Sequence, residues 1–301
     1  MAHVFCRELS LEQDEPLAGT GDMAPRTILV RWPRGKWRVP RFDSVDMGPE
    51  LSEAIRLAMK AVIHVALVDR VGDSDSIPQL QADGIAADFE TEAELAAAIR
   101  RVTAGEPLSG RPDPRLVVLC CTDSRRDACC ARFGFATYKA LAAAADPAKV
   151  QILQATHVGG CRFAASLVVL PDRRRYGRVA PEEAERFLET IGRGDLYLSA
   201  YRGRAGLPQP AQVAEHAAMV WAQQHGLSPD AVSLDDRDWP EEVTGGEELT
   251  ATAHAGSQPV SVRLRAEIMP VYGRCTAIGE AEPDPTPRWR LVEVTAAHTH
   301  V

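Results

Sequence analysis

Five of the seven cysteines in this 301-residue chain fall between positions 120 and 161, and this grouping constrains how the backbone around them can fold. They form two adjacent pairs at the ends of CCTDSRRDACC (120–130), and the fifth ends HVGGC (157–161). Neighbouring residues of an extended segment point to opposite sides, so one member of each pair should face a common site. We therefore expect two loops to meet at one place in the fold.

Cys121 and Cys130 are separated by eight residues, a spacing that fits a loop leaving a strand and returning at the start of a helix. His157 and Cys161 flank a Gly-Gly turn that could direct both side chains at one centre. Thiolates and imidazoles are the ligands used by zinc and by iron–sulfur clusters. The four side chains are therefore candidate metal ligands.

Three interpretations compete with an iron–sulfur centre at this site. Cysteines can simply be small buried apolar residues without a metal. A structural zinc site would normally use short C-x₂₋₄-C hooks, which this segment lacks. A thiol–disulfide enzyme normally carries C-x-x-C at a helix start, and the adjacent pairs here could form only strained bridges. The pattern favours an iron–sulfur centre, with a zinc scaffold or a metal-free thiol redox protein as the alternatives.

Four segments carry a resemblance to a known family: EPLAGT (15–20), CTDSRRDACC (121–130), THVGGCRFAASLVVLP (156–171) and YGRV (176–179). The chain resembles the sucrase/ferredoxin-like family, whose members carry a thioredoxin-like [2Fe–2S] ferredoxin domain. The family pattern is a cysteine, eight residues, a second cysteine and then H-x-G-G-H. The resemblance implies one [2Fe–2S] cluster, with Cys121, Cys130 and His157 among its ligands.

Position 161 departs from the family pattern, because this chain has a cysteine where the family usually has a histidine. Cysteine also binds iron, so we expect Cys161 to complete a site of three cysteines and one histidine. Cys129 or Cys120 is the alternative fourth ligand. Histidine ligation raises the potential of a cluster, so the exchange to thiolate is expected to lower it.

The residues next to these ligands have expected roles. Gly159 and Gly160 should shape the turn that carries His157 and Cys161. Thr156 and Arg162 should donate hydrogen bonds that tune the potential of the bound cluster.

The alternation of apolar patterns predicts an α/β protein with two consecutive thioredoxin-like units (1–108 and 109–204) and a small C-terminal α+β module (205–301). The Gly- and Pro-rich stretch 105–114 marks the first boundary. We expect strands at 27–30, 65–68, 85–89, 116–120, 150–155, 163–170, 176–179, 261–268 and 288–294, helices at 44–63, 135–145, 181–191 and 212–224, and a helix starting at Thr91.

The charge of the chain limits the kinds of partner that it can bind. The whole chain carries a formal net charge of −8, which argues against nucleic-acid binding. Residues 111–180 differ, with 12 Lys or Arg against 5 Asp or Glu, a local excess of +7. This excess would suit an acidic redox partner. The basic residues are Arg125, Arg126, Arg132, Arg162, Arg173, Arg174, Arg175 and Arg178 around the candidate ligands.

The expected activity is one-electron transfer without turnover of a substrate. No stretch is apolar enough for a membrane span or a secretory signal, so a cytoplasmic location is expected. Sugar hydrolysis would need two carboxylates flanking a cleft, and the acidic group at Glu182, Glu183 and Glu185 instead fits the first turn of a surface helix.

Overall fold

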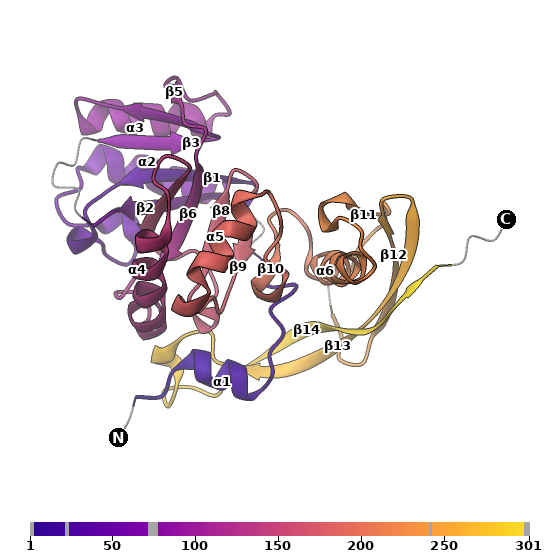
Figure 1. The fold of residues 1–301 in the computed structure, drawn as a ribbon. Helices are drawn as coiled ribbons and strands as arrows, with labels where there is room; N and C mark the ends of the chain where they lie inside the picture. Colours follow the sequence, from indigo (N-terminus) through magenta and orange to yellow (C-terminus); the bar gives the residue numbers. More distant parts are fainter. Residues whose placement is uncertain (1–2, 22–23, 72–77, 241–242, 298–301) are drawn as a thin grey trace.

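The computed structural model describes residues 3–21, 24–71, 78–240 and 243–297. Its centre is a ten-stranded mixed sheet in the order β10-β9-β8-β6-β7-β2-β1-β3-β4-β5, and a separate four-stranded sheet lies on the C-terminal side (Figure 1). The mixed α/β class expected from the sequence is therefore confirmed. None of the described helices combines the length and the apolar character needed to cross a lipid bilayer.

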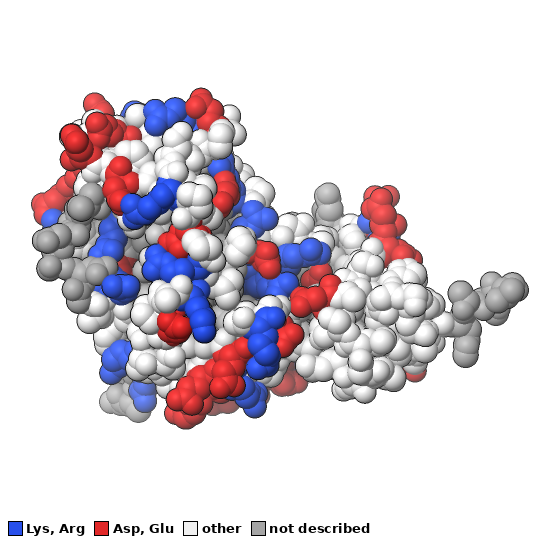
Figure 2. Space-filling view, turned by 45° about the horizontal axis from the view of Figure 1, so that its top comes forward, with Lys and Arg blue, Asp and Glu red and all other residues white. Residues whose placement is uncertain are grey.

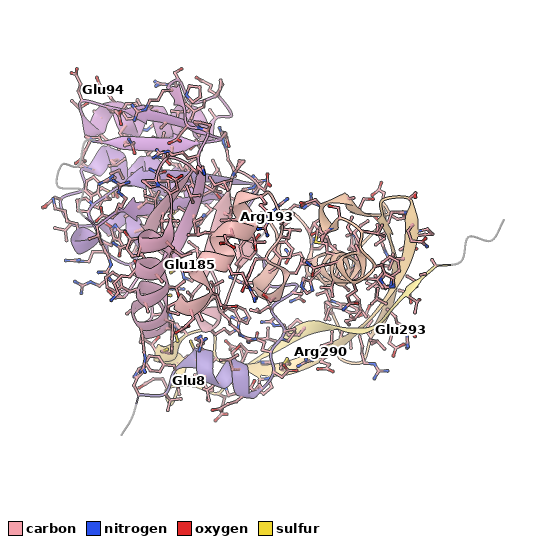
Figure 3. The ribbon with its side chains drawn as sticks, viewed as in Figure 1. Glu8, Glu94, Glu185, Arg193, Arg290 and Glu293 are labelled. Atoms are coloured by element: carbon pink, nitrogen blue, oxygen red, sulfur yellow. The ribbon has the colours of Figure 1, made fainter. Side chains whose placement is uncertain are left out.

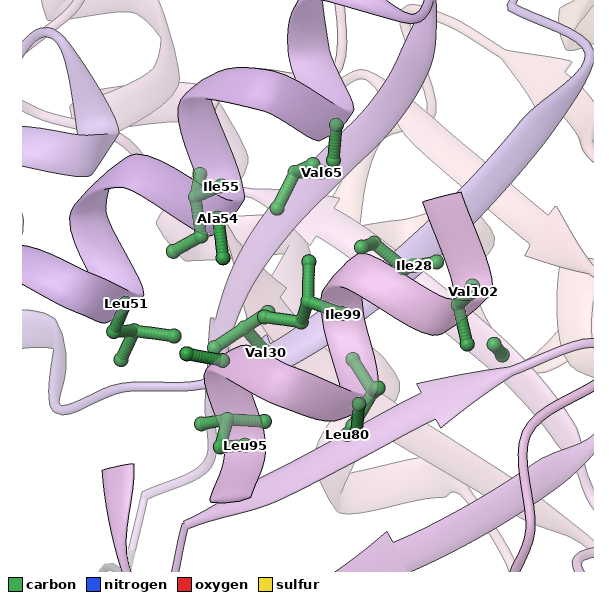
Figure 4. Close-up of a cluster of buried hydrophobic side chains, with 14 of the residues drawn as sticks. Ile28, Val30, Leu51, Ala54, Ile55, Val65, Leu80, Leu95, Ile99 and Val102 are labelled. Atoms are coloured by element: carbon green, nitrogen blue, oxygen red, sulfur yellow. The ribbon is translucent and has the colours of Figure 1, made fainter. Parts of the chain in front are cut away.

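The first half of the large sheet is built from residues 26–112. Its elements are β1 (Arg26–Arg31), η1 (Arg34–Lys36), η2 (Arg41–Asp43), α2 (Pro49–Lys60), β2 (Ile63–Asp69), β3 (Gln79–Ala82), β4 (Ile85–Asp88), α3 (Glu92–Thr103) and β5 (Arg111–Pro112). β1 pairs in parallel with β2 and antiparallel with β3. Apolar side chains of α2 and α3 pack against these strands in one continuous cluster, drawn in Figure 4.

The helix boundaries of this half have simple local causes. The side chains of Thr91 and Glu94 form the reciprocal capping bonds expected at the start of α3. The helix expected from residue 44 starts later, at Pro49, because proline favours the first helical turn. Ser44 instead closes a turn by donating to the carbonyl of Arg41 at 2.7 Å.

The second half repeats this order. Its elements are β6 (Leu116–Cys121), a π-helical turn η3 (Cys130–Gly134), α4 (Phe135–Ala144), β7 (Val150–Ala155), η4 (Cys161–Phe163), β8 (Leu167–Leu170), β9 (Arg174–Tyr176), η5 (Pro181–Glu183), α5 (Ala184–Gly192), η6 (Leu198–Ala200) and β10 (Tyr201–Arg204). β6 pairs in parallel with β7 and antiparallel with β8. The strand expected at 163–170 starts only at Leu167, because Phe163 ends the tight turn η4 and residues 164–166 lie outside any strand.

The two halves join edge to edge through β2 and β7, which run antiparallel with Val68 opposite Ala155. Directly paired residues of neighbouring strands point to the same face of a sheet. Both belong to a buried cluster that also contains Leu29 and Leu119, so one apolar layer crosses the junction. Helices α2 and α3 pack against alternate residues of the strands in the first half, and α4 and α5 pack against alternate residues of the strands in the second half.

The C-terminal part contains α6 (Gln209–Gln224), η7 (Pro229–Ala231), β11 (Val232–Leu234), β12 (Glu248–Ala255), β13 (Gln258–Val271), η8 (Cys275–Ala277) and β14 (Asp284–Ala296). α6 packs on the four-stranded sheet through Val213, Trp221 and their neighbours. β13 and β14 form a long antiparallel hairpin, and its connection extends below the large sheet to α1 (Cys6–Glu12), as Figure 1 shows. The sequence patterns did not predict α1.

A buried carboxylate joins the N-terminal segment to both other parts. The Glu15 side chain is fully buried, and it accepts hydrogen bonds from Arg162 at 2.9 Å and from Arg288 of β14 at 2.7 Å. The hydroxyl of Ser10 donates to it at 2.7 Å. Nearby, Arg290 of β14 donates to Asp14 at 3.0 Å (Figure 3).

The pKa of Glu15 reflects these partners. Burial alone would raise it, but the guanidinium groups of Arg162 and Arg288 and the Ser10 hydroxyl outweigh burial and hold it below its usual value. A carboxyl whose pKa is lowered by folding stabilises the protein above its unfolded pKa, and this contribution disappears as the pH falls through the folded pKa.

Replacing Glu15 by Gln should therefore lower the free energy of unfolding by about 3–5 kcal/mol at neutral pH, because two guanidinium groups lose their counter-charge. The wild-type protein should lose stability as the pH falls below about 4.3, the ordinary range of a glutamate. The variant should lose less over the same interval. Urea unfolding at several pH values measures both effects, with the exposed Glu8→Gln on α1 as the control (Figure 3). Equal losses in the two variants would contradict the assignment.

Candidate metal centre

The two cysteines at the end of β6, Cys120 and Cys121, point to opposite faces of the sheet. Cys121 lies on the same face as Val117 and Leu119, in the apolar layer shared by both halves. Cys120 points to the other face, where its sulfur donates to the carbonyl oxygen of Gly134 at 3.2 Å. The alternation of a strand therefore decides which of the two thiols reaches the site.

Cys130 enters from the other end of the loop, at the first residue of the π-helical turn η3. Its sulfur lies 3.3 Å from the sulfur of Cys121. Gly134 ends this turn, and a Cβ atom there would overlap the carbonyl oxygen of Cys121. A glycine at 134 thus lets the helix approach the strand end closely enough for the two sulfurs to meet.

His157 and Cys161 are held by the expected tight turn. Gly159 and Gly160 adopt positive φ angles of 91° and 72°, which favour glycine. Arg202 supports the turn by donating to the carbonyl of Gly159 at 3.1 Å, and a Cβ at Gly160 would overlap its guanidinium group. As a result, the Cys161 sulfur lies 3.4 Å from Nδ1 of His157.

The two pairs also contact each other, so all four side chains converge. Cys121, Cys130 and Cys161 belong to one buried cluster, and His157 and Cys121 shift each other's pKa. The three cysteines are buried and His157 is half-buried. We call these four residues the Cys121 site. It can hold a thiophilic metal or a metal–sulfur cluster.

The electrostatics of the Cys121 site favour the thiolate form at two of its three cysteines. Interaction with Cys130, and next with His157, holds the pKa of Cys121 well below its ordinary value against the opposing effect of burial. Interaction with the same two residues lowers the pKa of Cys161 to about 7, whereas interaction with Cys121 and Cys161 raises the pKa of Cys130 well above its ordinary value. Burial opposes the charged form of His157, but Cys121 and Cys161 raise its pKa to about 9. Thiolates are the form of cysteine that binds metals.

The alternative fourth ligands lie elsewhere. Cys120 faces the opposite side of the sheet, as described above, because strand residues alternate. Cys129 precedes Cys130 on the same helical turn and points away from it, with its sulfur 3.5 Å from that of Cys6. Neither residue belongs to the Cys121 site in this structure.

Two neighbours of the ligands have roles other than the expected ones. Arg162 directs its guanidinium group to Glu15. The hydroxyl oxygen of Thr156 accepts from the backbone N–H of Leu67 in β2 at 2.9 Å. The structure thus shows both residues attaching the ligand loop to its surroundings.

The first half of the sheet supports the site, a contribution that the sequence patterns did not reveal. Arg41 donates to the carbonyl of His157 at 3.0 Å, and Nε2 of His64 lies 3.3 Å from the same oxygen. Arg34 donates to the carbonyl of Thr122 at 3.3 Å.

A cleft of about 510 Å³ opens beside the half-buried side of the site. Its walls are His157, Cys161 and Arg162 on one side and the β13–β14 connection, with Tyr272 and Arg274, on the other. This cleft gives solvent or a partner access to the histidine edge of the site.

Much of the local excess of positive charge is internal. Arg175 is buried and donates to the carbonyl of Val158, and Arg178 donates to the carbonyl of Glu15. Arg174 pairs with Asp230 at 3.0 Å. Over the face drawn in Figure 2, basic and acidic side chains alternate across the large sheet's part of the molecule. Arg125 is exposed on the loop between β6 and η3.

The fold and this site define the chain as a mixed α/β protein with a buried centre of three thiols and one imidazole. Residues 21–203 match the model of the sucrase/ferredoxin-like family, and the chain belongs to that family.

Solved structures similar to part of the chain are thioredoxin-like [2Fe–2S] ferredoxins from Aquifex aeolicus. One is 22% identical with a TM-score of 0.29, over 32% of this chain and 96% of that chain. Another, described as the wild-type ferredoxin, is 21% identical with a TM-score of 0.26, over 29% of this chain and 95% of that chain. The search of curated proteins finds no match.

Replacing Gly134 by Ala should destabilise the protein by roughly 1–3 kcal/mol, because the added methyl group overlaps the carbonyl of Cys121. Gly192→Ala is the matched control, since Gly192 is also helical and a Cβ there meets nothing within 4 Å. The control should be neutral or slightly stabilising, as alanine favours helices. Urea unfolding measures both, and equal stability of the two variants would contradict the close approach.

Proposed function

We propose that this protein is an iron–sulfur electron carrier that holds one [2Fe–2S] cluster through Cys121, Cys130, His157 and Cys161. The observation that carries the proposal is that three thiols from two loops lie in one buried cluster, with the imidazole of His157 3.4 Å from the sulfur of Cys161. Membership of the sucrase/ferredoxin-like family supports it. Each half of the large sheet is, in this proposal, a thioredoxin-like unit, 1–108 and 109–204, followed by the C-terminal module 205–301.

The residues present fit such a cluster by the chemistry of their donor atoms. Cysteine thiolates, alone or with histidine, are the protein ligands of [2Fe–2S] centres. The lowered pKa values of Cys121 and Cys161 favour the ligating form of both residues. When bound, the cluster supplies one-electron redox chemistry at a potential set by its ligands and surroundings.

The surrounding residues have three tasks in this proposal. Leu119, Leu153 and Val168 of the shared apolar layer exclude water from the cysteine side. Backbone groups are fixed by side chains, with the N–H of His157 donating to Asp123 at 3.2 Å. His157, at the edge of the cleft, is the proposed point of electron entry and exit.

All seven cysteines are free and buried, which supports the proposal of a reducing, cytoplasmic location.

A metal-free thiol redox function is the second candidate, and the 3.3 Å contact between the Cys121 and Cys130 sulfurs favours it. A small movement would bring these sulfurs to the bonding distance of about 2.05 Å. A zinc scaffold at the same four residues is the third. Iron and sulfide analysis with an absorption spectrum separates the iron–sulfur candidate from the other two, because zinc and disulfides leave the protein colourless.

Cys161→His, which restores the family pattern, should retain the visible absorption and raise the midpoint potential by on the order of 100 mV, because imidazole replaces an anionic thiolate. Cys121→Ala should lose the iron and the colour. Cys120→Ala, which removes the neighbouring thiol on the other face, should keep both. Redox titration followed by EPR measures the potential. A colourless wild-type protein without iron, or retained iron in Cys121→Ala, would refute the proposal.

We also propose that the redox partner is acidic and docks over the cleft and the exposed loop at Arg125. Arg174 and Arg175, part of the expected charge excess, are engaged in internal bonds and are unsuitable probes. Arg125→Gln should slow oxidation of the reduced protein by anionic ferricyanide two- to threefold at low salt, and the difference should vanish at high salt.

Stopped-flow measurements with ferricyanide and with cationic hexaammineruthenium(III) test this charge effect. The rate of oxidation by the cationic reagent should rise in Arg125→Gln or stay the same as in the wild type. Arg193→Gln is the matched control, because Arg193 follows α5 (Figure 3) and lines neither the cleft nor the loop. Equal rates in Arg125→Gln and wild type would count against electrostatic docking here.

A further inference from the structure

Three cysteines that are far apart in the sequence meet at a second place. The sulfurs of Cys6, Cys129 and Cys275 form a triangle with sides of 3.5, 3.3 and 3.6 Å. The carboxylate of Asp127 lies 3.2 Å from the sulfur of Cys275 and 3.9 Å from that of Cys6. The four ligand atoms all lie within 4.8 Å of one another. We call these four residues the three-cysteine site.

The three-cysteine site is enclosed. Cys6 and Cys129 are at most 1% exposed, Asp127 is 2% exposed and Cys275 is 7% exposed. Phe5, Ala164 and partly buried aromatic side chains pack around the sulfurs. A carboxylate buried among three thiols in apolar surroundings is costly unless a cation or hydrogen bonds compensate it.

The dimensions indicate a single metal ion. Four ligands in a tetrahedron around zinc, with Zn–S bonds of about 2.3 Å, place their sulfurs roughly 3.8 Å apart. The observed sulfur separations are slightly shorter than this. An iron–sulfur cluster held by all four residues would spread the sulfurs further, because inorganic sulfides lie between the irons. The compact arrangement therefore suits one ion.

Backbone groups orient the ligands. The N–H of Cys275 donates to one carboxylate oxygen of Asp127 at 2.8 Å, and the N–H of Cys129 donates to the other at 2.8 Å. The N–H of Cys6 points at the sulfur of Cys275 at 3.5 Å. Such contacts fix ligand geometry and stabilise thiolates around a bound metal.

We propose that Cys6, Asp127, Cys129 and Cys275 bind one structural zinc ion. Three thiols and a carboxylate form a closed, four-coordinate site, and thiolate ligands select zinc over hard cations such as magnesium or calcium. Binding releases the thiol protons to solvent as the Zn–S bonds form, with no change in oxidation state.

This zinc would join three segments. Cys6 begins α1, Asp127 and Cys129 belong to the loop between β6 and η3, and Cys275 begins η8 in the β13–β14 connection. The same connection forms one wall of the cleft beside His157. Because Cys129 precedes Cys130, the zinc would also fix the loop that carries a residue of the Cys121 site. The inference stands independently of what the Cys121 site binds.

Metal analysis of the full chain tests this proposal. Protein purified without chelators under anaerobic conditions should contain one zinc per chain. Elemental mass spectrometry measures this zinc content, and the iron content in the same sample. The zinc content per chain of the Cys275→Ala variant should be at least tenfold lower than that of the wild-type protein. Cys120→Ala, with an equally buried thiol in neither site, should keep it. Cys121→Ala should also keep zinc, whatever its effect on iron.

Cobalt supplies a readout on the wild-type chain, should the variants fold poorly. Exchange of zinc for Co(II) should give the strong thiolate-to-cobalt absorption of a tetrahedral site, at one cobalt per chain. Wild-type protein that contains no zinc and gives no such band with cobalt would overturn the proposal. A disulfide between any two of Cys6, Cys129 and Cys275 in anaerobically purified protein would overturn it as well.

Discussion

The buried carboxylate of Glu15 is the interaction on which both cysteine sites depend. It places a negative charge where two guanidinium groups meet, one from Arg162 beside the candidate ligand Cys161 and one from Arg288 in the long hairpin. Such a group cannot remain buried without its partners, so its position forces the three segments together. The N-terminal segment, the ligand turn and the hairpin are thus fixed relative to one another. The hairpin in turn places Cys275 against Cys6 and Cys129.

Backbone geometry separates cysteines that are neighbours in the sequence. Cys120 and Cys121 point to opposite faces because they end a strand. Cys129 and Cys130 point in different directions because successive residues of a helical turn are rotated by about 100°. Cys121 and Cys130 therefore share one site. Cys129 joins another.

The first half of the large sheet supports the candidate metal centre without supplying any of its four side chains. The β2–β7 junction continues the apolar layer under the site, so the cysteines are buried by both halves. Arg34, Arg41 and His64 contact carbonyl groups of the two ligand loops. These contacts restrict the backbone of both loops.

The sequence alone predicts the α/β class, most strand and helix positions and the four candidate ligands Cys121, Cys130, His157 and Cys161. It could do so because period-two and helical patterns, the Gly-Gly turn and ligand spacing are local properties of the chain. It did not reveal the contact of Glu15 with Arg288 or the meeting of Cys6 with Cys275. Those contacts join residues from the two ends of the chain, and no local pattern records which distant segments pack together. Only the tertiary structure, through the burial of Glu15 and the reach of the β13–β14 hairpin, decided them.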